Sequence, residues 1–317
     1  MTPRSIVRAW RLACAAALAV PAAVAPAQRA PAVGTGGEGG ATEKVERRYA
    51  VSPTLSFRLS GSVGTVRLIG WEKDSLVVTG TVPKGVRVES AIGGDGRSPA
   101  PGAKLYLESP DDRSTASAVL EIRLPVRARA WIKSGTAHVE VTDFAGGADI
   151  NVIGGSVRVS SSPRELQVEA MDASVVIDGS PPWLRVKTAT GDITVRGSTD
   201  DAVVSSVSGG VRMEGGEVER ARVETVSGDI VFASVIAPSG ELTLDSHSGK
   251  VELRLPATGD FEADATSVTG TIDNRYDGRR PSPGREGRGQ SLTVGRGMAR
   301  ARANVRTFKG RIVLTHR

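Results

Sequence analysis

The stretches Thr188-Ala-Thr-Gly-Asp-Ile193, Ser206-Val-Ser-Gly-Gly-Val211 and Thr225-Val-Ser-Gly-Asp-Ile230 share one pattern: hydroxyl, apolar, hydroxyl, glycine, variable, apolar. A further apolar residue follows two places later, as at Val195. The glycine, or an alanine in its place, returns about every 18 to 21 residues, and the last step is twice as long. The series runs through Gly135, Gly155, Ala173, Gly191, Gly209, Gly228, Gly249, Gly270 and Gly310.

A second pair of apolar residues precedes each glycine by seven and five places. Both pairs have a period of two, which predicts two short strands per repeat, each with one buried face. One repeat cannot bury that face alone, whereas repeats stacked in register bury it continuously. We therefore predict an all-β protein, a β-solenoid with two short strands per coil. The preceding pairs are Ala148/Ile150, Leu166/Val168, Leu184/Val186, Ala202/Val204, Ala221/Val223, Leu242/Leu244, Ala263/Ala265 and Ala303/Val305.

The repeat has two further features that bear on the fold, its aligned columns and its corner residues. A Greek-key sandwich also has short strands and frequent turns, but it does not explain the aligned apolar columns. The glycine suits a corner with positive φ or a close approach of two backbones. The flanking hydroxyls suit a ladder that satisfies the backbone groups of the turns, and a comb of ligand-binding hydroxyls is the alternative.

The repeated motif resembles that of the bacterial putative-adhesin family, whose function is unknown. The similarity rests on Val226-Ser-Gly-Asp-Ile230 and its relatives, on Gly64-Thr-Val-Arg-Leu-Ile-Gly-Trp-Glu-Lys-Asp74, and on Leu124-Pro125, and it extends from about residue 45 to the end. The resemblance implies surface adhesion without an established site. The chain departs from the pattern at Met171-Asp-Ala-Ser174, which lacks the glycine, and in an arginine-rich insertion.

The N-terminal residues are typical of an exported protein. Residues 1–27 combine three arginines, an alanine-rich apolar run and the sequence Ala25-Pro-Ala27, which together indicate a secretory signal peptide. The only cysteine, Cys14, lies inside it, so disulfides and thiolate metal sites are not expected after cleavage. Residues 28–44 are rich in Gly, Ala and Pro and are predicted to be a disordered spacer. No transmembrane segment is predicted.

The folded part is expected to have two regions and one basic loop. Residues 45–133 alternate less regularly and are predicted to form an atypical N-terminal capping β region, followed by regular coils over 134–317. Residues 275–317 carry a net charge of +10, while residues 28–274 carry −7. The stretch 276–290 is predicted to be a mobile basic loop, and its arginines are candidates for binding anionic ligands: Arg279, Arg280, Arg285 and Arg288.

Candidate catalytic and metal-binding residues were also considered. Asp192 and Asp229 follow the glycine in coils two apart, about 10 Å at a strand spacing of ~4.8 Å, a separation compatible with an inverting glycosidase. Aspartate is also a common turn residue, so no catalytic residue is assigned. The three histidines fall in different columns, and neither a metal site nor a cofactor is predicted. Packing is the default role for Trp71, Trp131 and Trp183.

The sequence therefore predicts an exported, non-enzymatic protein of the periplasm, cell surface or medium, with an adhesin-like binding or structural role. The expected partners are an anionic envelope glycan, lipopolysaccharide or another envelope protein. Nucleic acid is not expected, because the arginines have no interleaved aromatic residues. A glycan-active enzyme using Asp192 and Asp229, and a regulatory module that senses the envelope, remain as alternatives. The sequence leaves the oligomeric state open.

Overall fold

The computed structural model describes residues 41–61, 64–94, 98–108, 118–257, 260–284, 287–295 and 300–317. The predicted signal peptide and most of the predicted spacer lie outside these residues. The described part of the chain consists of strands and turns, with no α-helix. This confirms the predicted all-β class.

The strands are β1 (Thr42–Gly61), β2 (Thr65–Trp71), β3 (Ser75–Pro83), β4 (Arg87–Ile92), β5 (Ala100–Glu108), β6 (Val119–Pro125), β7 (Arg129–Thr142), β8 (Gly147–Ser160), β9 (Glu165–Asp178), β10 (Trp183–Thr188), β11 (Ile193–Arg196), β12 (Thr199–Ser206), β13 (Val211–Thr225), β14 (Ile230–Ser246), β15 (Val251–Leu255), β16 (Phe261–Ser267), β17 (Thr271–Asn274), β18 (Ser282–Pro283), β19 (Gln290–Gly295), β20 (Ala301–Thr307) and β21 (Arg311–His316).

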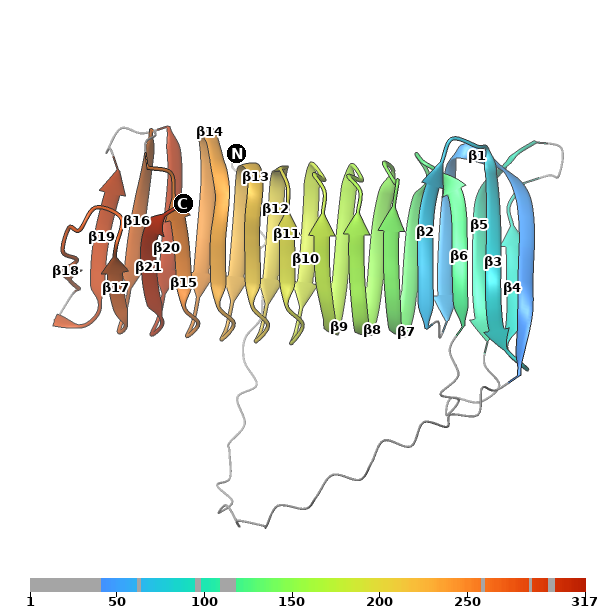
Figure 1. Ribbon diagram of the computed structural model, residues 1–317, viewed down its shortest axis with the longest axis horizontal. Coiled ribbons are helices and arrows are strands. Elements are labelled where there is room, and N and C mark those ends of the chain that lie inside the picture. The colour runs from blue at the N-terminus through green and yellow to red at the C-terminus, as the bar shows by residue number, and fades with distance from the viewer. Residues whose placement is uncertain are drawn as a thin grey trace, which may run out of the picture. The chain divides into compact units, whose positions relative to one another are not determined.

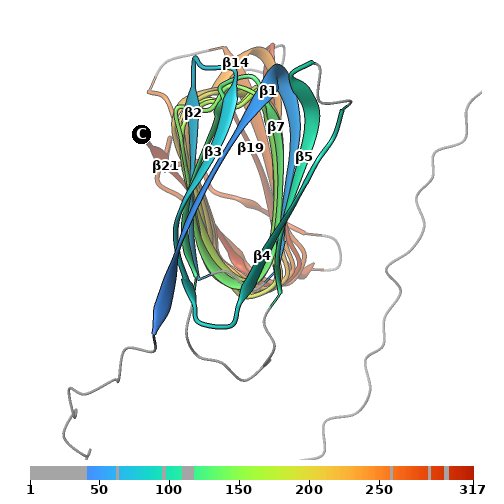
Figure 2. The ribbon, with the colours of Figure 1, turned by 90° about the vertical axis from the view of Figure 1, so that its right-hand side faces the viewer.

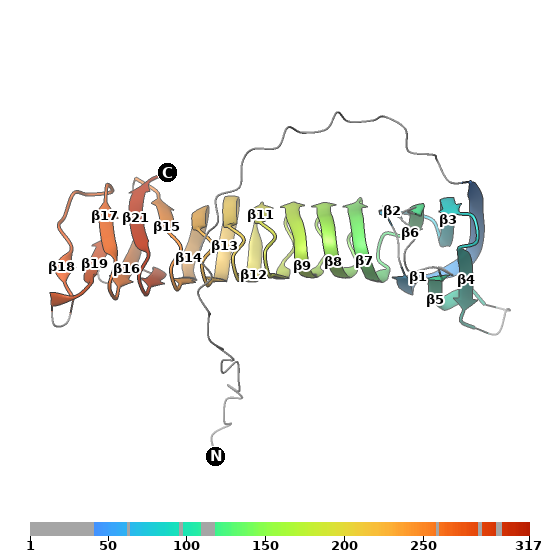
Figure 3. The same ribbon diagram turned by 90° about the horizontal axis from the view of Figure 1, so that it is seen from below.

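Residues 41–317 form a flattened solenoid with two walls. The coils follow one another along the long axis in Figure 1, and the view along that axis in Figure 2 shows the walls enclosing a narrow interior. Sheet A contains β10, β12, β16 and β20, and sheet B contains β11, β15, β17 and β21. The longer strands β7, β8, β9, β13 and β14 bend at a corner and belong to both sheets. Figure 3 shows the two rows of strands from below.

The predicted apolar columns line the interior. Parallel pairing sets Leu184 against Ala202 in sheet A and Ile193 against Val211 in sheet B, so like positions lie directly above one another. The residues at the predicted column positions are buried in every coil but the outermost one. There Asn274 takes the position equivalent to Val195 and interrupts that column. The β-solenoid with two strands per coil is therefore confirmed.

Each coil turns from sheet A to sheet B at the glycine corner, defined by residues 188–192 and their equivalents. A Cβ on Gly209 would lie 2.6 Å from the carbonyl carbon of Gly191 and closer still to its oxygen. Close approach of backbones, rather than positive φ, therefore requires glycine at this position. The buried hydroxyl of Thr225 donates to Gly228 O at 2.7 Å, and that of Ser246 accepts from Gly249 N at 2.9 Å. These bonds confirm the turn role of the hydroxyls.

The first coil is out of register with the predicted series. Gly135 lies beside Ile153, and Ala137 occupies the glycine column beside Gly155. The buried pair of this coil that matches Val157 and Val159 is accordingly Val139 and Val141, with Ala137 also buried. An alanine in the glycine column concealed the true position from the sequence pattern.

Both ends of the stack depart from chain order in the same way. At the C-terminal end, β20 and β21 lie between the β14/β15 coil and the β16/β17 coil. At the N-terminal end, the second half of β1 and β2 lie between the β5/β6 coil and β7. The long step from Gly270 to Gly310 is therefore an insertion into the stack, not two successive coils as predicted. Each inserted coil gains hydrogen-bonding neighbours on both sides.

Antiparallel strands cover the outer coils. β3 pairs with β6, β4 with β5, and β19 with β16. The edge segment Thr42–Ala50 of β1 carries five charged side chains, a device that discourages pairing with other chains.

Three predicted boundaries move. Residues 42–44, assigned to the spacer, belong to β1, and the first regular coil begins at Arg129, earlier than 134. The stretch 276–290, predicted as a mobile loop, contains β18 and the start of β19, and Gln290 Oε1 accepts from Ile272 N at 2.6 Å. No helix among the described residues is long and apolar enough to cross a membrane.

Candidate functional site

The outward face of sheet A carries a grid of side chains on neighbouring strands. Parallel pairing of β7, β8, β9 and β10 aligns Arg129, Gly147, Glu165 and Trp183 in one column. The next outward column contains Trp131, Asp149, Gln167 and Arg185. These residues alternate with the buried ones along each strand, so the same period that builds the core presents them to solvent.

Gly147 has no side chain, and the Arg129 side chain lies over it, beside a hollow in this grid. The hollow has a volume of about 560 Å³, compared with about 340 Å³ for the hollow beside Phe308 and about 310 Å³ for the hollow beside His316. Its lining residues are Arg129, Ala148, Asp149, Arg164, Glu165, Gln167 and Trp183. Arg129 Nη2 and Glu165 Oε2 are 2.6 Å apart and span the glycine. The lining holds two arginines and two carboxylates, so its formal charges balance.

Tryptophans stand at two places on this face. The Trp183 ring forms one wall of the hollow, and the Arg185 guanidinium lies 4.4 Å from its centroid. The guanidinium groups of Arg58 and Arg129 lie 5.1 and 5.3 Å from the Trp131 centroid. Both indoles are only partly buried and lie outside the interior. The two indoles pack against arginines on the outer face and not in the interior.

Polar groups in and beside the hollow are held by hydrogen bonds. Asn151 Nδ2 donates to Asp149 Oδ1 at 2.6 Å, and Gln167 Nε2 donates to Glu169 Oε1 at 3.4 Å. Partial burial raises the pKa of Asp149 above its ordinary value, and the Asn151 hydrogen bond only partly opposes this. A flat aromatic wall beside fixed donors and acceptors suits a ligand with both apolar faces and hydroxyl groups.

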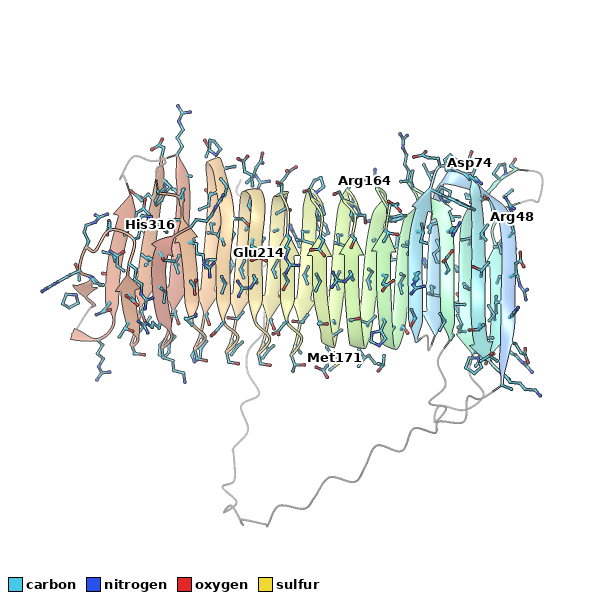
Figure 4. The ribbon with its side chains drawn as sticks, viewed as in Figure 1. Arg48, Asp74, Arg164, Met171, Glu214 and His316 are labelled. Carbon is cyan, nitrogen blue, oxygen red and sulfur yellow. The ribbon has the colours of Figure 1, made fainter. Side chains whose placement is uncertain are left out.

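The outward face of sheet B also carries ion pairs. Arg196 bonds Asp178 at 3.1 Å and Glu214 at 2.9 Å, and the latter is labelled in Figure 4. Glu252 bonds both Lys250 and Arg254. The Arg196 pairs join adjacent coils, whereas the Glu252 pairs lie along a single strand.

The structure gives Asp192 and Asp229 a role at the glycine corner. Asp192 Oδ1 accepts from Gly210 N at 2.7 Å, and Asp229 Oδ1 accepts from Lys250 N at 2.8 Å. Both side chains are exposed and lie in coils two apart, as predicted. Each carboxylate thus links one coil to the next, while the hypothesis of catalysis by this pair stays untested.

The predicted anion-binding arginines lie near the C-terminal end of the stack, far along the chain from the hollow. Arg279 Nε donates to Asp277 Oδ2 at 2.6 Å, and Arg280 and Arg288 are exposed. Arg285 lies outside the described residues. Binding of an anion by this group stays a prediction.

The histidines are dispersed, as expected. His138 Nδ1 lies 2.9 Å from Ser156 Oγ, the His247 ring stacks on Phe308, and His316 contacts Tyr276. Among the described residues, no group of three or more His, Cys, Asp or Glu side chains is placed to hold a metal ion.

Comparison with known families identifies the regular coils. A family model described as Toastrack DUF4097 matches residues 176–314. The matched domain covers less than half of the chain. This domain begins in β9 and ends in β21, so it includes Trp183, whereas the other lining residues of the hollow precede it. No curated protein matches the chain.

Two solved structures are similar to this chain. One is described as a putative cell adhesion protein from Clostridium sporogenes ATCC 15579, with 11% identity and a TM-score of 0.23, covering 87% of this chain and 100% of the other. The second is described as a putative adhesin from Bacteroides fragilis NCTC 9343, with 13% identity and a TM-score of 0.33, covering 86% of this chain and 97% of the other.

Proposed function

We propose that this protein is an exported, non-enzymatic binding module of the bacterial envelope or cell surface, and that the hollow on sheet A holds a segment of an uncharged glycan. The observation that carries the proposal is the Trp183 wall beside Asp149, Glu165 and Gln167. A sugar ring has an apolar face that fits an indole, and its hydroxyls can bond the neighbouring carboxylates and amide. The balanced charge of the lining favours a neutral ligand over an acidic one.

Export rests on the predicted signal peptide at residues 1–27. Cell fractionation followed by mass spectrometry of the mature N-terminus tests it. Recovery of the uncleaved chain in the cytoplasm would contradict this part of the proposal.

The glycan site is tested by filling the hollow without removing any of its groups. Gly147→Val adds a side chain whose nearest neighbours are atoms of the flexible Arg129 side chain, the closest at 3.4 Å, so the fold should persist while Arg129 is displaced within the lining of the hollow. We expect a screen of neutral and acidic envelope glycans to identify a neutral ligand for the full chain. Calorimetry should then give at least about tenfold weaker binding for Gly147→Val and for Trp183→Ala, which is about 1.4 kcal/mol.

Thr243→Val is the matched control, because Thr243 faces outward on sheet A in a coil distant from the hollow. Its affinity should equal that of the natural chain. No binding of any neutral glycan, or undiminished binding by Gly147→Val, would overturn the site. New reducing ends appearing with time would instead favour a glycan-active enzyme, and repetition with Asp192→Asn and Asp229→Asn would test that alternative.

A further inference from the structure

An exposed apolar line runs along the glycine corner. Each coil contributes the residue between the two hydroxyls of the repeat, and Figure 4 shows one of them, Met171, projecting from the lower edge. Nine large hydrophobic side chains are exposed among the described residues, and six belong to this line. We name it the corner ridge; in spatial order it contains Ile153, Met171, Ala189, Val207, Val226, His247, Phe308 and Val268.

The fold itself does not require apolar residues on the corner ridge. The buried hydroxyl and the glycine make the turn, as described above, while the ridge side chain points into solvent. Gly135, Ala189 and His247 occupy the same position in other coils, so the corner accepts residues of very different character. Val207 and Val226 are each 49% exposed and Met171 is 60% exposed. Exposed apolar side chains gathered in one place are typical of an interaction surface.

The corner ridge is straight and regularly spaced. Val207 N donates to Ala189 O at 3.2 Å and Val226 N donates to Val207 O at 3.2 Å, which keeps successive corners in register. Seven steps of ~4.8 Å give the ridge a length of about 34 Å. The His247 and Phe308 rings stack with centroids 5.1 Å apart and an interplanar angle of 4°.

Charge is distributed unequally along the ridge. Beside Phe308, in the second coil from one end, lie Arg306 and Lys309, both exposed. Beside Met171, in the second coil from the other end, lie Glu169 and Asp172. One position is therefore basic and the other acidic, at equal distances from the midpoint of the ridge between Val207 and Val226.

We propose that a second copy of this chain docks on the corner ridge in antiparallel orientation, about a twofold axis at that midpoint. This arrangement brings Met171 of each copy to Phe308 of the other, and a methionine sulfur contacts an aromatic ring favourably. It also places the basic coil against the acidic coil, whereas parallel docking would set like charges together. The ridge residues of each copy are separated by the strand spacing. Each ridge residue of one copy therefore lies opposite a ridge residue of the other along the whole contact, as an isologous interface requires.

The contact is narrow, which sets the expected strength. A ridge one side chain wide and about 34 Å long buries less than the roughly 800 Å² per partner of a standard interface. Self-association should therefore be weak and reversible, and it should be visible only at high protein concentration.

Sedimentation equilibrium on the full chain at rising concentration measures this association. Val207→Thr combined with Val226→Thr keeps the side-chain shape at the proposed axis while adding hydroxyls, and should weaken association at least about tenfold. Val119→Thr is the control, since Val119 is 45% exposed on β6, three coils beyond the Ile153 end of the ridge, and should leave association unchanged. A chain that stays monomeric at every concentration, or equal loss in the control, would overturn the proposal.

Orientation is tested by a charge exchange. Lys309→Glu alone and Asp172→Lys alone should each weaken association, and the two together should restore it, because each acid again faces a base. Failure of restoration, with circular dichroism showing folded variants, would exclude the antiparallel docking. Binding to vesicles of anionic lipid is measured in parallel. If the natural chain never dimerises but binds these vesicles, and the double variant Val207→Thr/Val226→Thr does not bind them, the ridge contacts a membrane surface. That result would overturn the proposal that a second copy docks there.

Discussion

Each coil has two corners: the glycine corner, where the chain passes from sheet A to sheet B, and the loop corner, where it returns from sheet B to sheet A. The glycine corner has a fixed length, and the loop corner does not. From Thr188 to Ile193, and at every equivalent position, the glycine corner spans five residues. The loop corner spans seven residues from Val195 to Ala202, ten from Phe232 to Leu242, and 29 from Asn274 to Ala303. Where the corner backbone contacts the neighbouring coil directly, this contact fixes the length of the corner and the residue type it accepts. Where the corner backbone projects into solvent, neither its length nor its residue type is fixed.

The largest effect is expected for Gly209→Ala. Its Cβ would meet Gly191 and Thr190 O, both backbone, so the neighbouring coil must shift, and overpacking against backbone should cost about 3 kcal/mol. Denaturant unfolding monitored by circular dichroism measures the loss. Gly135→Ala is the control in the same corner, because a Cβ there meets nothing within 4 Å. Equal losses in both variants would show that close approach does not explain the glycine column.

An intermediate effect is expected for Ser246→Ala. Ser246 is 1% exposed and accepts from Gly249 N, so its removal leaves this buried donor without a partner and should cost about 1 to 3 kcal/mol. Ser248→Ala, which removes an exposed hydroxyl bonded to Val226 O at 3.2 Å, should cost less than about 0.5 kcal/mol. Equal costs would remove the distinction between the two hydroxyl positions.

The smallest effect is expected in the loop corner. Gly-Ser inserted between Pro238 and Ser239, both exposed, should change the free energy of unfolding by less than about 0.6 kcal/mol, since lengthening a loop costs little entropy. The same dipeptide inserted between Ser208 and Gly209 should disrupt the stack, and thermal melting compares the two. A large loss at Pro238 would mean that the loop corner is as constrained as the glycine corner.

Much of the fold could be predicted because core positions repeat. Ala202, Val204 and Val211 are buried at their predicted places, since alternation and coil length together determine which side chains meet. The position of Ala137 was missed because alanine does not mark the corner as glycine does. The inserted terminal coils were missed because their columns are identical to those of successive coils, so the pattern contains no record of spatial order.

The candidate site was largely missed, although part of its signal is visible in the sequence. Trp131 and Trp183 each precede a core residue, Ile132 and Leu184, and alternation alone therefore directs both indoles outward. The hollow could not be predicted from alternation alone. It depends on the pairing of three strands, which places Gly147 between Arg129 and Glu165.

The sequence by itself determined the two-walled solenoid, its buried columns and the chemistry of its glycine corners, because these depend on residues close together in the chain and repeated in every coil. Only the tertiary structure decided the order of the terminal coils, the hollow beside Trp183 and the line of the corner ridge. Those features depend on which coil lies next to which, and hydrogen bonds between strands 18 to 61 residues apart, such as Ile193 with Val211 and Val251 with Ile312, establish that order.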